Sequence, residues 1–309
     1  MTILDRAIVR ALPAVPRPVV KRLSSRYIAG TTLTEACDVV RVLNAQGKEA
    51  TLDVLGEEVT LREEATGLRD VYRRALDTID EEGLRSNVSV KLTALGLKLD
   101  PKLCRSNLVA LVEGAAPLGN FVRIDMEDSS TTSETLALYR DLRNGGHDNL
   151  GVVLQAALKR TLTDIEGLAD LTPSVRICKG IYVEPAEIAY QEDETIRLNF
   201  LDVLEALFDV GSYVGIATHD DWLIGEALAL LERRKLGRAD YEFQMLLGVR
   251  PRLGDALVEE GHRLRIYVPF GSHWYEYSLR RLQENPSIAG YVASDTIGRV
   301  LRPGRNGSL

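Results

Sequence analysis

Residues 151–156, GVVLQA, and residues 174–179, SVRICK, indicate the fold most directly. Each is a short apolar run rich in β-branched residues, which is typical of a buried strand. Six further runs of this kind occur along the chain, and helical patterns lie between them. They are ATLDVL at 50–55, NVSVKL at 87–92, FVRIDM at 121–126, YVGIAT at 213–218, YEFQML at 241–246 and LRIYVP at 264–269.

Two of the intervening segments carry clear helix signals. The sequence Thr60-Leu61-Arg62-Glu63 matches a capping box, and apolar residues then recur at helical spacing until Gly83. Asp220 and Asp221 open a second helix of the same character. Helices therefore alternate with strands.

Eight strands that alternate with helices predict parallel pairing, and eight is the number that closes a (β/α)8 TIM barrel. An open, doubly wound sheet is the competing α/β fold, but its GxGxxG motif after the first strand is absent. We expect residues 1–49 to form an N-terminal helical extension and residues 50–309 to form one barrel domain. A last helix, at about 274–284, follows the eighth strand after a short connection, so it is expected to lie over the barrel mouth.

Composition limits the function classes. The 309 residues are 45% hydrophobic and 27% charged, with a net charge of −7, which disfavours nucleic acid as a partner. Three scattered cysteines without a CxxC motif indicate a reduced cytoplasmic protein, and no secretory or membrane-spanning stretch is present. The first 30 residues are basic, which fits a solvated helix face or peripheral contact with the inner face of a membrane. Their basic residues are Arg6, Arg10, Arg17, Lys21, Arg22 and Arg26.

Polar side chains stand at the carboxyl ends of the predicted strands, where barrel enzymes place their chemistry. One such residue can be a surface accident, but several together predict a site because buried polar groups need partners. The four histidines lack metal-binding spacing, so no metal is expected. The polar strand ends are Lys91, Asp125, Gln155, Arg176, Lys179, Thr218, His219 and Tyr267.

Arg280 and Arg281 are adjacent on the last predicted helix. A solvated basic patch is the ordinary reading of such a pair. A helix over the barrel mouth could instead aim both guanidinium groups inward, where with Lys91 they would bind a carboxylate. Tyr182, Tyr267 and Tyr277 would then supply flat walls for a small ring.

Eight segments in order resemble the proline dehydrogenase family. The resemblance covers residues 25–285 and implies a distorted (β/α)8 barrel with non-covalent FAD. It also implies oxidation of L-proline to Δ1-pyrroline-5-carboxylate by hydride transfer to flavin N5, with reoxidation by membrane quinone and a downstream pyrroline-5-carboxylate dehydrogenase as a partner. The segments are DVLGE at 53–57, SVKLTALG at 89–96, RIDMED at 123–128, VLQAAL at 153–158, VRICKGIYVEP at 175–185, ATHD at 217–220, YEFQMLLG at 241–248 and RIYVPFGSHWYEYSLRRLQEN at 265–285.

The resemblance also implies a role for each matching residue. Asp125 and Arg176 are expected to be catalytic, with Arg176 donating to flavin N5, and Glu57 is expected to pair with Arg280 as a gate. The substrate residues implied are Lys91, Tyr182, Leu246, Tyr267, Tyr277, Arg280 and Arg281. The FAD contacts implied are Met126, Gln155, Arg176, Lys179, Gly180, Ile181, Thr218, His219 and Glu284.

Two departures and two rival functions accompany this interpretation. Ile181 stands where relatives often have alanine, and Val183 stands where some have tryptophan, so the pocket volume and one aromatic contact are open. The first rival is a Schiff-base lyase that uses Lys91 or Lys179 as the amine nucleophile. The second is a non-catalytic protein that binds an amino acid through the same carboxylate clamp.

Overall fold

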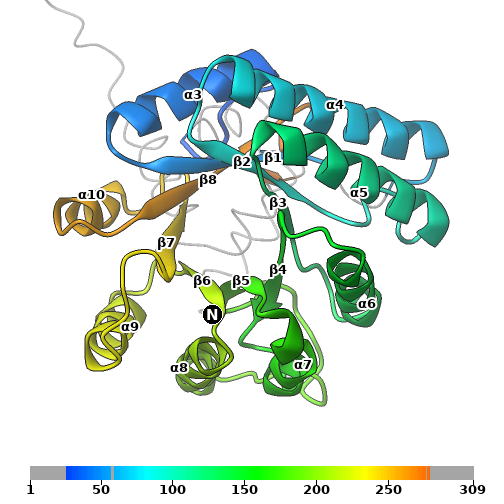
Figure 1. Cartoon of the computed structure of the whole chain (residues 1–309). Helices are drawn as coiled ribbons and strands as arrows, with labels where there is room; N and C mark the ends of the chain where they lie inside the picture. Colours follow the sequence, from blue (N-terminus) through cyan, green and yellow to red (C-terminus); the bar gives the residue numbers. More distant parts are fainter. Residues whose placement is uncertain (1–25, 57–58, 276, 279–309) are drawn as a thin grey trace, which may run out of the picture.

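The computed structural model describes residues 26–56, 59–275 and 277–278. Eight parallel strands form one closed barrel in sequence order, and the last strand pairs with the first (Figure 1). The predicted (β/α)8 barrel is therefore confirmed, and the predicted strand ends differ from the observed ones by two residues at most. The strands are β1 (Glu49–Val54), β2 (Ser86–Val90), β3 (Val122–Ile124), β4 (Leu150–Gln155), β5 (Ser174–Cys178), β6 (Tyr213–Ala217), β7 (Tyr241–Leu246) and β8 (Leu264–Phe270).

Helices surround the barrel and cover the outer faces of its strands (Figure 1). No described helix is long and apolar enough to cross a membrane. The helices are α3 (Leu33–Ala45), α4 (Arg62–Glu81), α5 (Pro101–Ala115), α6 (Thr132–Asn144), α7 (Thr161–Leu168), α8 (Asp193–Asp209), α9 (Asp221–Arg233) and α10 (Pro251–Glu259), with short 3-10 turns at Ala116–Leu118 and Ala169–Leu171.

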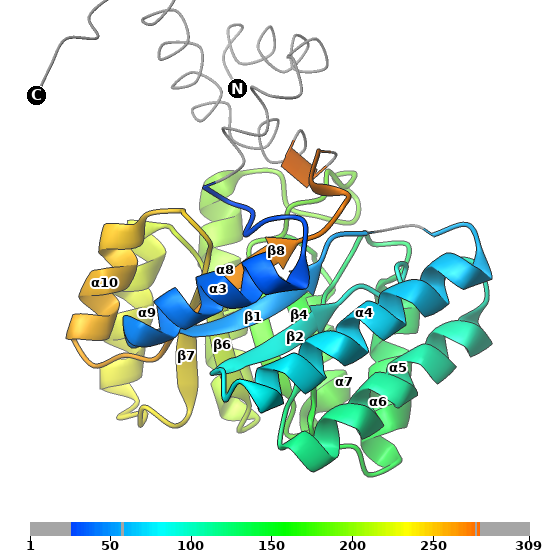
Figure 2. The same cartoon turned by 90° about the horizontal axis from the view of Figure 1, so that it is seen from above.

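Helix α3 lies within the segment expected to be an extension of the barrel. It packs against β1 and β8, and Figure 2 shows it lying across β1. Its N-terminus is a complete capping box, because Thr32 accepts from the Glu35 amide while the Glu35 carboxylate accepts from the Thr32 amide. The division of the chain at residue 49 stays a prediction.

Helix α4 corrects the expected capping box by one residue. Glu64, not Glu63, accepts hydrogen bonds from the amides of Thr60 and Leu61, both at 3.1 Å. The helix then buries an apolar stripe against the barrel that includes Tyr72 and Leu76. The buried stripe sets the rotation of the helix about its axis, and in that rotation Glu64 is the carboxylate that bonds to the amides of the first turn.

The mouth of the barrel is built from distant parts of the chain. The Ala29 amide donates to the Pro269 carbonyl at 2.9 Å, so the segment before α3 lies along the end of β8. Ile28, Leu55 and Tyr277 form a small apolar cluster there. Residues 274, 275, 277 and 278 are helical, so the described start of the last helix lies at this mouth.

Candidate active site

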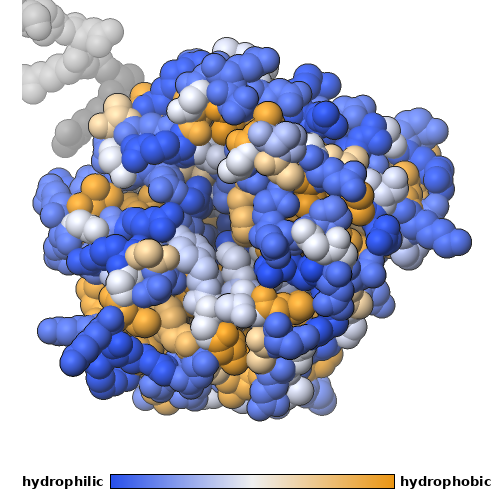
Figure 3. Space-filling view, viewed as in Figure 1, coloured by the Kyte–Doolittle hydropathy of each residue, from blue (hydrophilic) through white to orange (hydrophobic). Residues whose placement is uncertain are grey.

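One cavity of about 430 Å³ opens among the carboxyl ends of the strands. Figure 3 shows the opposite end of the barrel, because the strands end on the side that faces away from the viewer in Figure 1; hydrophilic side chains cover much of that face. Every predicted site residue in the described part of the chain lines this cavity. They are Lys91, Asp125, Met126, Gln155, Arg176, Lys179, Gly180, Ile181, Tyr182, Thr218, His219, Leu246, Tyr267 and Tyr277.

Other predicted residues are not placed here, and some lining residues were not predicted. Glu57, Arg280, Arg281 and Glu284 lie outside the described residues. The unpredicted lining residues are Val153, Cys178, Ala217, Asp220, Gln244 and Met245. Cys178 lies two positions after Arg176 in β5, and Gln244 lies two positions before Leu246 in β7, so each shares a strand face with a predicted residue. The period of two along a strand was therefore the signal that could have found them.

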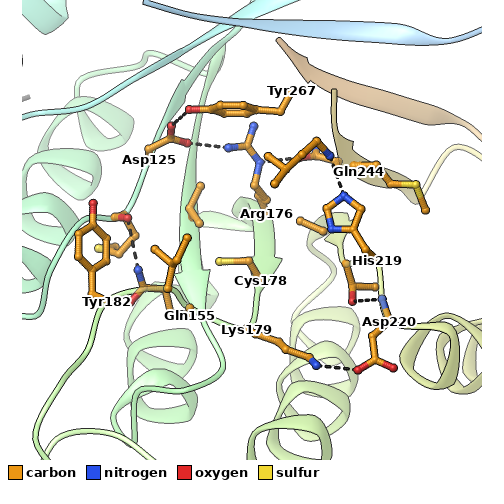
Figure 4. A pocket seen from close by; sticks show the side chains of 18 of the residues that line it. Asp125, Gln155, Arg176, Cys178, Lys179, Tyr182, His219, Asp220, Gln244 and Tyr267 are labelled. Carbon is orange, nitrogen blue, oxygen red and sulfur yellow. Dashed lines mark hydrogen bonds and ion pairs between the residues drawn. The ribbon is translucent and has the colours of Figure 1, made fainter. Parts of the chain in front are cut away.

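Asp125 and Arg176 form a buried ion pair at the centre of the site (Figure 4). The Asp125 Oδ1 atom accepts from Arg176 Nη1 and from Ser89 Oγ, each at 2.6 Å, and Oδ2 accepts from the Tyr267 hydroxyl at 2.7 Å. Burial raises the pKa of Tyr267 well above its ordinary value, so its phenol stays protonated and donates. Three donors therefore fix this carboxylate, and the guanidinium carbon lies 5.3 Å from the centre of the Tyr267 ring.

A second buried carboxylate lies under Lys91. Asp53 Oδ1 accepts from Lys91 Nζ at 2.7 Å and from the Tyr72 hydroxyl at 3.3 Å. Asp53 is fully buried, and this burial raises its pKa although the Lys91 charge acts in the opposite direction. Lys91 thus places a cation in the cavity wall, while its partner Asp53 is buried and does not line the cavity.

Lys179 and Arg197 both donate to Asp220 Oδ2, at 2.6 and 2.7 Å. Asp220 Oδ1 accepts from the amides of Trp222 and Leu223, so the same side chain caps α9. Burial would raise the pKa of Asp220, but the hydrogen bonds from the two cations outweigh it and lower the pKa to about 2. The predicted helix start at Asp220 is confirmed, and it anchors a basic side of the cavity.

Two further side chains are fixed by backbone groups. Gln155 Nε2 donates to the carbonyls of Met126 and Glu127, at 3.3 and 3.2 Å. His219 Nε2 accepts from the Leu246 amide at 2.8 Å, and because an amide can only donate, this nitrogen carries no proton. The Gln155 contacts join the end of β4 to the end of β3, and the His219 contact joins the end of β6 to the end of β7.

The donors on this wall suit a flat heterocycle that bears phosphate groups. An amide, a guanidinium, an ammonium and a hydroxyl come from Gln155, Arg176, Lys179 and Thr218. At Gly180 the backbone has φ +102°, and an added Cβ would lie 3.2 Å from the Ala157 Cβ, so only glycine keeps this part of the wall open. Among the described residues, no group of three or more His, Cys, Asp or Glu side chains is placed to hold a metal ion.

The two departures from the family pattern have different surroundings. The Val183 side chain is fully exposed and lies off the cavity, so it makes no contact with the described wall. Ile181 lines the cavity and is 42% exposed, so its larger side chain borders the opening. Of the two departures, only Ile181 therefore borders the pocket and bears on its volume.

Comparisons with known proteins agree on one family. A family model described as proline dehydrogenase matches residues 36–294. Proline dehydrogenase 1 of Bacillus subtilis is 37% identical over 267 residues, which cover 86% of this chain and 88% of that protein. Proline dehydrogenase of Deinococcus radiodurans is 32% identical over 296 residues, which cover 94% of each chain.

A solved structure supports the fold. The structure of proline utilization A from Bdellovibrio bacteriovorus, inactivated by N-propargylglycine, superposes with a TM-score of 0.82 at 21% identity. The match covers 98% of this chain but 41% of that one, so the present chain spans less than half of the length of that protein.

Proposed function

The chain belongs to the proline dehydrogenase family, and from this premise we propose that it oxidises L-proline to Δ1-pyrroline-5-carboxylate, the first step of proline catabolism. One observation carries the proposal. Lys91 presents a cation, and Tyr182, Tyr267 and Tyr277 present flat walls, in the cavity that holds the Asp125–Arg176 pair. A small ring with a carboxylate suits these groups.

In this proposal the chain itself binds and orients the substrate. Lys91 offsets the desolvation of the carboxylate, together with Arg280 and Arg281 of the predicted clamp. The tyrosines and Leu246 keep water from the ring and limit its orientation. Orientation of this kind contributes strongly to the rate, because the reacting atoms must come within about 3–3.5 Å.

FAD is the proposed electron acceptor, and when bound it would supply the two-electron chemistry that protein side chains lack. Arg176 would stand beside the flavin as a hydrogen-bond donor with a positive charge. The residues proposed to hold FAD are Met126, Gln155, Lys179, Gly180, Ile181, Thr218 and His219, with Glu284 beyond the described residues.

The wider partners are proposed from the family resemblance. Membrane quinone would reoxidise the cofactor, in keeping with peripheral contact through the basic residues of the first 30 positions. Glu57 and Arg280 would gate the site. A pyrroline-5-carboxylate dehydrogenase would take the product, because the product requires further oxidation to reach glutamate.

The Schiff-base alternative requires an amine nucleophile, and a protonated amine does not attack a carbonyl. Lys91 and Lys179 are each ion-paired with a carboxylate, at 2.7 and 2.6 Å. Neither lysine is therefore arranged as a nucleophile.

The test is anaerobic addition of L-proline to the as-purified protein. We expect a flavin absorbance band that bleaches with proline and recovers with a quinone analogue. Proline binding measured by calorimetry without bleaching or dye reduction would favour the binding protein instead. A substrate adduct trapped by borohydride would favour the lyase.

A further inference from the structure

A buried chain of polar side chains continues below Arg176 into the barrel. Arg176 Nε donates to Gln244 Oε1 at 2.5 Å, and Gln244 Nε2 donates to Glu242 Oε1 at 2.5 Å. The same carboxylate oxygen accepts from Arg265 Nε at 2.7 Å. The exposed fractions are 6% for Arg176, 5% for Gln244 and 2% for Glu242. These groups therefore form hydrogen bonds with one another and not with bulk water.

Chemistry fixes the orientation of the Gln244 amide. A guanidinium can only donate hydrogen bonds and a carboxylate can only accept them, so the amide oxygen must face Arg176 and the amide nitrogen must face Glu242. Burial would raise the pKa of Glu242, but the charge of Arg265 and the hydrogen bonds from Arg265 and Gln244 together outweigh it and lower the pKa. Glu242 is therefore ionised and holds the amide in one orientation.

The barrel also leaves room for this amide at Gly215. In the strand register, Gly215 of β6 pairs with Arg176 on one side and with Glu242 on the other. A Cβ added at Gly215 would lie 2.4 Å from Gln244 Nε2, which is closer than any real contact. The Gln244 amide therefore fits between Arg176 of β5 and Glu242 of β7 because Gly215 has no side chain.

We propose that Gln244 is a positioning residue for Arg176, supported by Glu242 and Gly215. Asp125 fixes the Nη1 end of the guanidinium and Gln244 fixes its Nε, so two contacts on different edges define its plane (Figure 4). Gln244 is neutral, and so it orients Arg176 without cancelling its charge, while the charge of Glu242 is directed to Arg265. The inference rests on the proposed function for the role of Arg176 beside the flavin.

The orientation itself is measured without reference to activity. In the full chain labelled with 15N-arginine, the Nε–H signal of Arg176 is assigned by its loss in Arg176→Lys, in samples with and without added FAD. We expect hydrogen exchange of this signal to accelerate on the order of tenfold or more in Gln244→Met, as loss of a hydrogen bond to a charged group implies. Gly215→Ala should act alike, because it displaces the amide.

A matched control separates this effect from a generic glycine substitution. An added Cβ at Gly225, in α9, meets nothing within 4 Å, so Gly225→Ala should leave the Arg176 signal unchanged. Gln244→Glu keeps an acceptor for Arg176 but sets a second carboxylate against Glu242. It should retain the slow exchange while the midpoint potential of bound flavin becomes more negative.

Steady-state kinetics with proline complete the test. Gln244→Met should lower kcat by about tenfold or more, with a smaller change in KM, because the amide orients Arg176 and does not touch the predicted carboxylate clamp. Slow Nε–H exchange and normal kcat in Gln244→Met would overturn the inference and leave the proposed function standing. A wild-type protein without flavin bleaching would overturn the proposed function, and the exchange measurement would still decide the positioning role.

Discussion

At the scale of single residues, the interior of this barrel holds two buried ion pairs, whose attraction must offset the cost of removing four charges from water. Asp53, Lys91, Asp125 and Arg176 all lie at most 9% exposed, and each is paired. Buried pairs repay their desolvation only when the geometry is good and the remaining atoms are also bonded. Ser89 and Tyr267 supply those additional bonds for Asp125. Tyr72 adds a bond to Asp53 Oδ1, but Asp53 Oδ2 is buried without a hydrogen-bond partner among the described residues, so only the Asp125 pair is completed by hydroxyl groups.

The Lys91–Asp53 pair predicts a stability effect with a definite pH dependence. Lys91→Met leaves a buried carboxylate without its cation and should lower the free energy of unfolding by about 3–5 kcal/mol near neutral pH. Burial raises the pKa of Asp53 in the folded state. The folded chain therefore binds a proton that the unfolded chain releases, and the stability of the variant should fall as pH rises through that raised pKa.

Urea unfolding at pH 5 and pH 8 measures this effect, and the double variant Asp53→Asn/Lys91→Met should recover part of the loss. A deficit that is equal at both pH values and unchanged in the double variant would show that lost packing, and not the uncompensated charge, is responsible.

At the scale of elements, the eight strands could be predicted because each is a short apolar run between helical patterns. The site could be predicted in part, because Arg176 and Lys91 stand out as polar residues at strand ends. Gln244 could have been found only from its spacing of two from Leu246, and Asp53 was missed because it lies inside β1 and does not line the cavity. The shift of the α4 cap from Glu63 to Glu64 was also beyond the sequence, since either carboxylate can reach the first turn and packing decides.

Helix α9 offers a prediction at this scale. Asp220→Asn keeps a cap acceptor but removes the charge that Lys179 and Arg197 share, and it should cost about 1 kcal/mol of stability at pH 7 after solvent screening. The folded pKa of Asp220, about 2, lies below its ordinary value. Its contribution is therefore present above the unfolded pKa and is lost as pH falls toward 2, so wild type and variant should converge in acid.

Denaturant curves between pH 7 and pH 2.5 provide the measurement. Asp221→Asn is the matched control, because Asp221 is 64% exposed and its pair with Arg250 is a surface contact. The control should change stability by less than about 0.5 kcal/mol. An Asp220→Asn deficit that persists unchanged at pH 2.5 would mean that the charge plays no part in it.

At the scale of the whole molecule, the cavity joins strands that are far apart in the chain. Lys91 comes from the end of β2, Gln155 from β4 and Tyr267 from β8, so a bound ligand connects opposite sides of the barrel. A ligand that binds only the folded state raises stability by mass action. Cofactor binding should therefore be visible in the unfolding of the entire domain.

FAD at about 100 times its Kd should stabilise the chain by about 2.7 kcal/mol, which corresponds to a rise in Tm of about 4 °C for a domain of this size. Gly180→Ala should lose most of this rise, since its φ of +102° strains any side chain and the cavity wall changes there. Gly146 is the control, because it has φ +89° with nothing within 4 Å of an added Cβ and does not line the cavity. Differential scanning fluorimetry with and without FAD should show both variants with a lower starting Tm and only Gly146→Ala with the full rise. If Gly180→Ala also retains the full rise, the backbone at Gly180 is not part of the cofactor wall.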